Sequence, residues 1–157
     1  MEQAIITAVV HDSAESKVTV VRVPDKPGIA ARLFRSLAEN DVNLDMIVQN
    51  VSLGGTTDIS FTVPKRDLDT AMEVCRSHAD EIGAEDVLAD ADIAKVSLVG
   101  AGMKTNPGVG ARMFETLADN GINIEMISTS PIRLTCVVRA EQVEPAVQAL
   151  HEAFELS

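Results

Sequence analysis

Two segments of the chain combine a predicted helix start with small residues, and this combination suits the binding of a carboxylate. Proline is favoured at the first position of a helix, so the Pro-Gly pair in each segment predicts that a helix begins there. The first N–H groups of a helix lack intrahelical partners and carry partial positive charge, which attracts anions. The two segments are Asp25, Lys26, Pro27, Gly28, Ile29 and Ala30, and Thr105, Asn106, Pro107, Gly108, Val109 and Gly110.

The strand predicted after each helix carries polar side chains that suit the other groups of an amino acid. An acidic residue, Asp45 in one strand and Glu125 in the other, suits an ammonium group, and each follows its proline by eighteen residues. Polar residues that suit a ligand's side chain lie near the strand ends: Gln49, Asn50, Thr129 and Ser130. These groups together indicate a small amino acid as the ligand.

Each of these features also has a purely structural explanation. A Pro-Gly pair is a common turn and helix-start signal. Asp45 and Glu125 alternate with apolar neighbours, as residues on an exposed strand face do, and Asn43 and Asn123 are common turn residues. Recurrence of the whole set favours a binding site, although duplication preserves structure as well.

The set recurs because the chain contains an internal repeat. Residues 27–47 (PGIAARLFRSLAENDVNLDMI) and 107–127 (PGVGARMFETLADNGINIEMI) are identical at eleven of twenty-one positions. A fixed-period repeat indicates that one structural unit is used twice. We therefore expect two domains, one at residues 15–92 and one at residues 93–157 joined by an N-terminal strand within residues 1–14.

Apolar periodicity predicts the element order βαββαβ for the first copy. Two helices on one face of a four-stranded antiparallel sheet form the ferredoxin-like arrangement of the α+β class. Asp67 is expected to cap the second helix through its side chain. The predicted elements are strands at 17–23, 42–51, 58–63 and 84–89, and helices from Pro27 and from Asp67 to about Asp80.

The second copy has the same order but ends one strand short. Its predicted elements are a strand at 94–100, a helix from Pro107, a strand from Ile122, a hairpin at Ser130 and Pro131, a strand at 132–138 and a helix over 143–154. The apolar run at 4–10 (AIITAVV) has no place in the first copy. We therefore expect it to complete the sheet of the second copy.

Composition excludes several classes of function. The net charge of −11, from 24 acidic and 13 basic residues, argues against nucleic acid or an anionic membrane as a partner. The absence of a long apolar run and of a signal peptide predicts a cytoplasmic protein. The two cysteines, Cys75 and Cys136, stand apart from any ligand pattern, so we expect no metal and interpret both as buried core residues. Thr105 stands where a dinucleotide-binding loop starting at Gly100 would need its third glycine, so we expect no cofactor.

Several phrases of the sequence closely resemble the C-terminal regulatory region of bacterial aspartate kinases, which consists of two ACT domains. The phrases are DKPG, NLDMIVQNVS, TTDISFT, KVSLVGAGM, NPGV, INIEMISTSPIR and LHEAF. The resemblance implies a regulatory chain without a kinase domain, similar to the separate β subunit that accompanies a catalytic α subunit. It also implies a homodimer formed by ACT–ACT pairing, and feedback inhibition of lysine, threonine and methionine synthesis.

The resemblance further implies effector sites for threonine and/or lysine, which largely coincide with the two segments described above. Two departures from the family pattern lie at the second site, where Pro131 replaces an acidic residue and Gly110 replaces a hydroxyl residue. The loop at 53–55 is also shorter. The implied site residues are Asp25, Lys26, Pro27, Gly28, Ile29, Ala30, Asn43, Leu44, Asp45, Gln49, Val109, Gly110, Asn123, Ile124 and Ser130, and the repeat adds Glu125 at the position equivalent to Asp45.

Two alternatives to an aspartate kinase regulator remain open at this point. The first is an ACT-type amino-acid sensor that regulates a different enzyme or a transcription factor. The second is a small enzyme that uses the carboxylates of Asp45 and Glu125 as acid and base. No nucleophile with a nearby base is discernible in the sequence, so the chain is expected to be non-catalytic.

Overall fold

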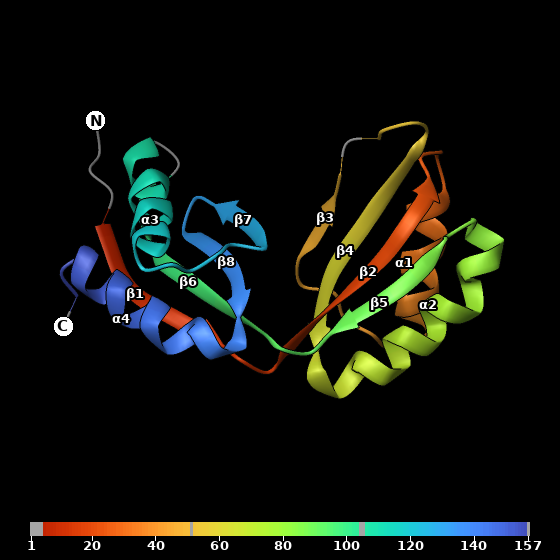
Figure 1. The fold of residues 1–157 in the computed structure, drawn as a ribbon, viewed down its shortest axis with the longest axis horizontal. Helices are drawn as coiled ribbons and strands as arrows, with labels where there is room; N and C mark the ends of the chain where they lie inside the picture. The colour runs from red at the N-terminus through yellow and green to blue at the C-terminus, as the bar shows by residue number, and fades with distance from the viewer. Residues whose placement is uncertain (1–4, 51, 104–105, 157) are drawn as a thin grey trace. The chain divides into compact units, whose positions relative to one another are not determined.

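The computed structural model describes residues 5–50, 52–103 and 106–156, and the chain divides into two compact units (Figure 1). We call Ala14–Ala91 the first module, and Met1–Ser13 together with Asp92–Ser157 the second module. Each module is a four-stranded antiparallel sheet with two helices. The predicted α+β class with two ferredoxin-like modules is therefore confirmed.

The first module has the strand order β3-β4-β2-β5. Helices α1 and α2 pack against each other and cover one face of this sheet (Figure 1). They do so because α1 buries Leu33 and Leu37, one turn apart, and α2 buries Met72 and Cys75 on its inner face. The elements are β2 Glu15–Pro24, α1 Ile29–Glu39, β3 Ile47–Gln49, β4 Thr56–Pro64, α2 Leu68–Ile82 and β5 Asp86–Asp90.

The second module has the strand order β1-β6-β8-β7, and β1 pairs antiparallel with β6. The N-terminal strand thus takes the edge position that β5 holds in the first module, as predicted; Ala4, where the predicted strand begins, lies outside the described residues. The elements are β1 Ile5–Asp12, β6 Ile93–Ala101, α3 Pro107–Asp119, β7 Met126–Ser130, β8 Arg133–Arg139 and α4 Val143–Ala153.

The two helices that follow the Pro-Gly pairs begin differently. Helix α3 starts at Pro107, as predicted, whereas α1 starts at Ile29 and Pro27 precedes it. The reason is Gly28, whose φ of 91° lies in the left-handed region and keeps it outside the helix as the N-cap residue. The prediction of a helix starting at Pro27 was therefore wrong by two residues.

The strands that follow these helices are shorter than predicted. In place of a strand from Val42, β3 covers only Ile47–Gln49, and in place of one from Ile122, β7 begins at Met126. The N–H of Val42 donates to the carbonyl of Leu37 at 3.0 Å, and the N–H of Ile122 donates to Leu117 at 2.9 Å. These bonds end the helices, so the chain reaches the sheet several residues later. Val51, the predicted strand end, lies outside the described residues.

Two local features also differ from expectation. Asp67 occupies the N-cap of α2 after a short 3₁₀ turn, Lys65–Asp67, but its side chain makes no capping hydrogen bond. Strand β2 contains a bulge at Arg22, whose φ is 50° and whose N–H donates to Asp58 Oδ1 at 2.8 Å. A bulge of this kind re-aims the end of the strand that leads to α1.

The two cysteines are buried in the cores, as predicted, and burial keeps their thiols protonated at neutral pH. Burial raises the pKa of Cys75 and the pKa of Cys136 from 9.0 to about 12. We expect a thiol reagent at pH 8 to label neither cysteine in the folded chain and both in denaturant. Because the unfolded thiols ionise near pH 9, the free energy of unfolding should fall between pH 9 and 12. Rapid labelling under native conditions would contradict this expectation.

Candidate functional site

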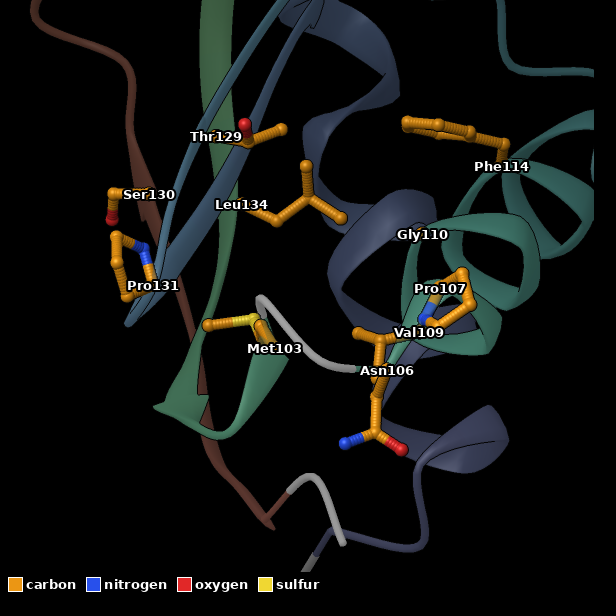
Figure 2. Close-up of a pocket in the computed structure, with 10 residues that line it drawn as sticks. All are labelled: Met103, Asn106, Pro107, Val109, Gly110, Phe114, Thr129, Ser130, Pro131 and Leu134. Atoms are coloured by element: carbon orange, nitrogen blue, oxygen red, sulfur yellow. The ribbon is translucent and has the colours of Figure 1, made fainter. Parts of the chain in front are cut away.

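Each module has a cavity at the start of its first helix. The cavity of the first module has a volume of about 180 Å³, and that of the second module about 480 Å³ (Figure 2). We call them the first cavity and the second cavity. Val23, Pro24, Asp25, Lys26, Pro27, Gly28, Ile29, Ala30, Gln49, Thr57 and Ile59 line the first cavity. Met103, Asn106, Pro107, Val109, Gly110, Phe114, Thr129, Ser130, Pro131 and Leu134 line the second.

Strand register shows that the two cavities are equivalent. Ile47 lies opposite Phe61 in the first module and Ile127 lies opposite Cys136 in the second, so β4 and β8 correspond with an offset of 75 residues. Six positions therefore recur in both linings: Lys26 and Asn106, Pro27 and Pro107, Ile29 and Val109, Ala30 and Gly110, Gln49 and Thr129, and Ile59 and Leu134. The repeat places a helix start, the end of an edge strand and the next strand together twice.

The helix starts at both cavities lack a side-chain cap. The N-cap residues are Gly28 and Asn106, and neither makes a side-chain capping bond. Asn106 is engaged elsewhere, because its Nδ2 donates to the carbonyl of Gly102 at 2.9 Å. First-turn N–H groups without a capping side chain suit an anionic group such as a carboxylate.

The predicted segments Asn43–Asp45 and Asn123–Glu125 lie at the other end of their strands. The N–H of Asp45 donates to the carbonyl of Thr62, whereas Gln49 at the first cavity pairs with Ile59. These partners are three residues apart on β4, which corresponds to about 10 Å along a strand. In the second module, the N–H of Glu125 likewise donates to the carbonyl of Val137 on β8, so Glu125 lies at the same distance from its cavity. Within one module, therefore, neither acidic residue reaches the cavity.

Glu125 also has a partner of its own. Its Oε2 lies 3.5 Å from Arg139 Nη1, and the side chains are only 17% and 33% exposed. A ligand ammonium at Glu125 would have to compete with this partly buried guanidinium. The two carboxylates proposed as an acid–base pair, Asp45 and Glu125, belong to different modules.

The structure thus brings together only part of the predicted set. Leu44 and Ile124 pack against the two cores, while Asn43 and Asn123 are exposed away from the cavities. Asn50 lines a different hollow, of about 700 Å³, with Arg22 and other residues of the first module. Thr105 lies outside the described residues. The predicted residues that line a cavity are Asp25, Lys26, Pro27, Gly28, Ile29, Ala30, Gln49, Asn106, Pro107, Val109, Gly110, Thr129, Ser130 and Pro131.

Sequence reasoning missed several apolar lining residues. In the second cavity these include Met103, Phe114 and Leu134, and in the first they include Ile59. Phe114 follows Gly110 by four residues, so helical spacing was a signal that both face the same space. Leu134 carried no comparable signal, because its place depends on the register of β8.

Among the described lining residues of the two cavities, the charged side chains are Asp25 and Lys26, and both line the first cavity. Among the described residues, no group of three or more His, Cys, Asp or Glu side chains is arranged to hold a metal ion. In the same part of the chain, no helix has the length and apolar composition needed to cross a membrane. What the two cavities share is an uncapped helix start beside the end of an edge strand.

Comparison with known proteins agrees with this architecture. Residues 18–78 and 96–154 both match the ACT domain family. The chain therefore belongs to the ACT domain family, with one ACT domain in each module.

Within the ACT domain family, the chain is similar to the regulatory parts of aspartate kinases. It is 51% identical to an aspartokinase from Mycolicibacterium smegmatis over 99% of its own length, and it spans 38% of the length of that curated relative. It matches a chain in a crystal structure of aspartokinase α and β subunits with a TM-score of 0.92 and 41% identity, covering 97% of this chain and 100% of the other.

A second solved structure gives the same result. The ligand-free regulatory subunit of aspartate kinase from Thermus thermophilus matches with a TM-score of 0.91 and 40% identity, covering 95% of this chain and 98% of that subunit. These 157 residues therefore correspond to the regulatory part of an aspartate kinase and include no kinase catalytic domain. The family resemblance seen in the sequence is confirmed.

Proposed function

We propose that the chain binds threonine and/or lysine in the helix-start cavities and thereby mediates allosteric feedback inhibition of an aspartate kinase. The observation that carries this proposal is the recurrence of one cavity, at an uncapped helix start, in both modules. The first-turn N–H groups would bind the effector's carboxylate. An effector shifts a conformational equilibrium only by its differential affinity for the two states, so binding must favour one arrangement of the regulatory part.

The ammonium group of the effector needs a partner that a single module does not supply at the cavity. Asp45 and Glu125 lie at the far ends of their strands, about 10 Å away along the sheet. We propose that the segments Asn43–Asp45 and Asn123–Glu125 contribute to cavities on a module of a second chain. The effector would then stabilise the pairing of chains as well as occupy a cavity.

The proposed partners are a second copy of this chain and a catalytic α subunit of aspartate kinase. The edge strands β3 and β7 carry equivalent isoleucines, Ile47 and Ile127, which are 51% and 45% exposed. Exposed apolar residues on an unpaired strand edge favour association with another strand. Such an assembly, acting on cytoplasmic synthesis of lysine, threonine and methionine, fits the net charge of −11, which disfavours nucleic acid and anionic membranes.

Calorimetry and thermal unfolding of the chain test the proposal. We expect heat of binding and a raised melting temperature with L-threonine, L-lysine or both together, because a ligand that binds only the folded state stabilises it. At one hundred times its Kd, a ligand raises the free energy of unfolding by about 2.7 kcal/mol. L-threonine amide, which lacks the carboxylate, should bind far more weakly if helix N–H groups hold that group.

D-threonine is the matched control, since it has the same charge and composition but is the mirror image of L-threonine, with the opposite configuration at both Cα and Cβ. The absence of heat and of any thermal shift with threonine, lysine and their mixture would contradict effector binding by this chain. If threonine and its amide bound equally well, the chain would still bind the effector, but the proposal that the helix starts bind its carboxylate would be contradicted.

A further inference from the structure

The second cavity differs from the first in volume and in the chemistry of its walls. At about 480 Å³ against 180 Å³, it falls in the range of small-molecule pockets, and the first cavity lies below that range. Figure 2 shows the side chains of Met103, Val109, Phe114 and Leu134 around this space. The second cavity thus has an apolar interior next to a helix start.

The described lining of the second cavity contains no charged side chain, whereas Asp25 and Lys26 line the first cavity. The polar lining residues of the second cavity are Asn106, Thr129 and Ser130, and Asn106 is already engaged with Gly102. A lysine ammonium placed among these apolar side chains would lose its hydration without gaining a carboxylate from the cavity's own described lining. An uncharged aliphatic side chain would instead gain from burial.

Gly110 provides much of the available space. A Cβ at this position would lie 3.9 Å from a ring carbon of Phe114 and 4.0 Å from a methyl carbon of Leu134, so it would point into the cavity at ordinary contact distance. The equivalent residue of the first cavity is Ala30, whose methyl group already fills that direction. Gly110 lies within α3 and has no left-handed φ, so its backbone accepts any side chain without strain.

We propose that the second cavity selects an uncharged amino acid with an aliphatic side chain the size of leucine or methionine, that it excludes lysine, and that Gly110 determines this selectivity. The inference rests on the proposed function, because it takes the cavity to be an amino-acid site. The carboxylate lies at the start of α3 and the side chain lies between Phe114 and Leu134.

Titration calorimetry of the full chain with L-alanine, L-threonine, L-leucine, L-methionine and L-lysine tests this selectivity. Each additional buried methylene is expected to tighten Kd about fourfold, so leucine and methionine should bind more than tenfold more tightly than alanine. The Gly110→Ala variant should weaken their binding, and Gly110→Leu, which fills the cavity, should abolish it. Both variants should keep the circular dichroism spectrum of the parent chain.

Ala111→Leu is the matched control, because it places a leucine side chain at the next residue of α3, which is exposed and does not line the cavity. Leucine binding that is lost in Gly110→Leu and retained in Ala111→Leu supports the proposal. The proposal is overturned if leucine and methionine do not bind, if Gly110→Leu binds them as the parent does, or if lysine binding also depends on Gly110. Failure of threonine and lysine to bind, with Gly110-dependent binding of leucine, would overturn only the effectors named under the proposed function.

Discussion

Replacing Phe61 with alanine is expected to lower the free energy of unfolding of the first module by about 3–5 kcal/mol. Phe61 on β4 is fully buried, and its ring meets Phe34 edge to face with centroids 6.0 Å apart at an interplanar angle of 85°. Truncation removes this contact and leaves a cavity between the sheet and α1. Since domains of this size are marginally stable, this loss is expected to be a large fraction of the free energy of unfolding of the module.

Urea unfolding followed by far-UV circular dichroism measures this loss. Cys136 is the control, because strand register places it in the second module where Phe61 stands in the first. Cys136→Ala removes a single buried sulfur and should cost only about 1 kcal/mol. Comparable losses for the two variants would show that the Phe34–Phe61 contact is not the principal stabilising feature of the first core.

Replacing Gly100 with valine is expected to detach β1 from the sheet of the second module. A Cβ on Gly100 would collide with the carbonyl oxygen of Ile5 and would lie 3.0 Å from the Cα of Ile6. Both contacts involve backbone atoms, which cannot rotate away as a side chain does. A register shift between Ile6 and Ala8 adjoins this point, so the close approach belongs to an irregular part of the β1–β6 pairing.

The expected cost of this overpacking is about 1–3 kcal/mol, and it should be accompanied by faster amide hydrogen exchange in β1. Gly108→Ala is the control, because a Cβ there meets no heavy atom within 4 Å and the residue lies in helix α3. That control should stabilise the chain by about 0.5–1 kcal/mol. A Gly100→Val chain with unchanged stability and a protected β1 would refute the close approach.

The equivalence of the two cavities also clarifies why the chain carries two copies of one unit. The shared parts are the uncapped helix start and the end of the edge strand, which suit groups common to all amino acids. The differences, Ala30 against Gly110 and Gln49 against Thr129, lie where a ligand's side chain would be distinguished. We therefore expect the two sites to differ in ligand selectivity.

Local spacing predicted most of the elements correctly. Leu33 and Leu37 recur at helical spacing and are buried, and Ile59, Phe61 and Val63 alternate along β4 and are also buried. These periodicities arise because one face of each element packs on the core. The same reasoning failed at Val42, whose apolar pattern fits a strand but whose N–H completes a turn at the end of α1.

The candidate site was predicted only in part, for a related reason. Asp25, Gly28 and Gln49 line a cavity as expected, but Asp45 does not. Asp45 and Gln49 are four residues apart in the sequence, yet their backbone partners on β4 lie about 10 Å apart along the strand. Assigning Asp45 to the ammonium group and Gln49 to the side chain of one small ligand within a module neglected this separation.

By itself, the sequence determined that one βαββα unit is used twice, that each copy has an apolar core, and that the chain resembles the regulatory part of aspartate kinases. These conclusions depend on periodicity and on repeated residues, which are properties of the chain alone. Only the tertiary structure decided that Leu134 and Phe114 face Gly110, that Glu125 is held by Arg139, and that the second cavity is the larger. These properties depend on strand order and register, which bring distant residues together and leave no local signal in the sequence.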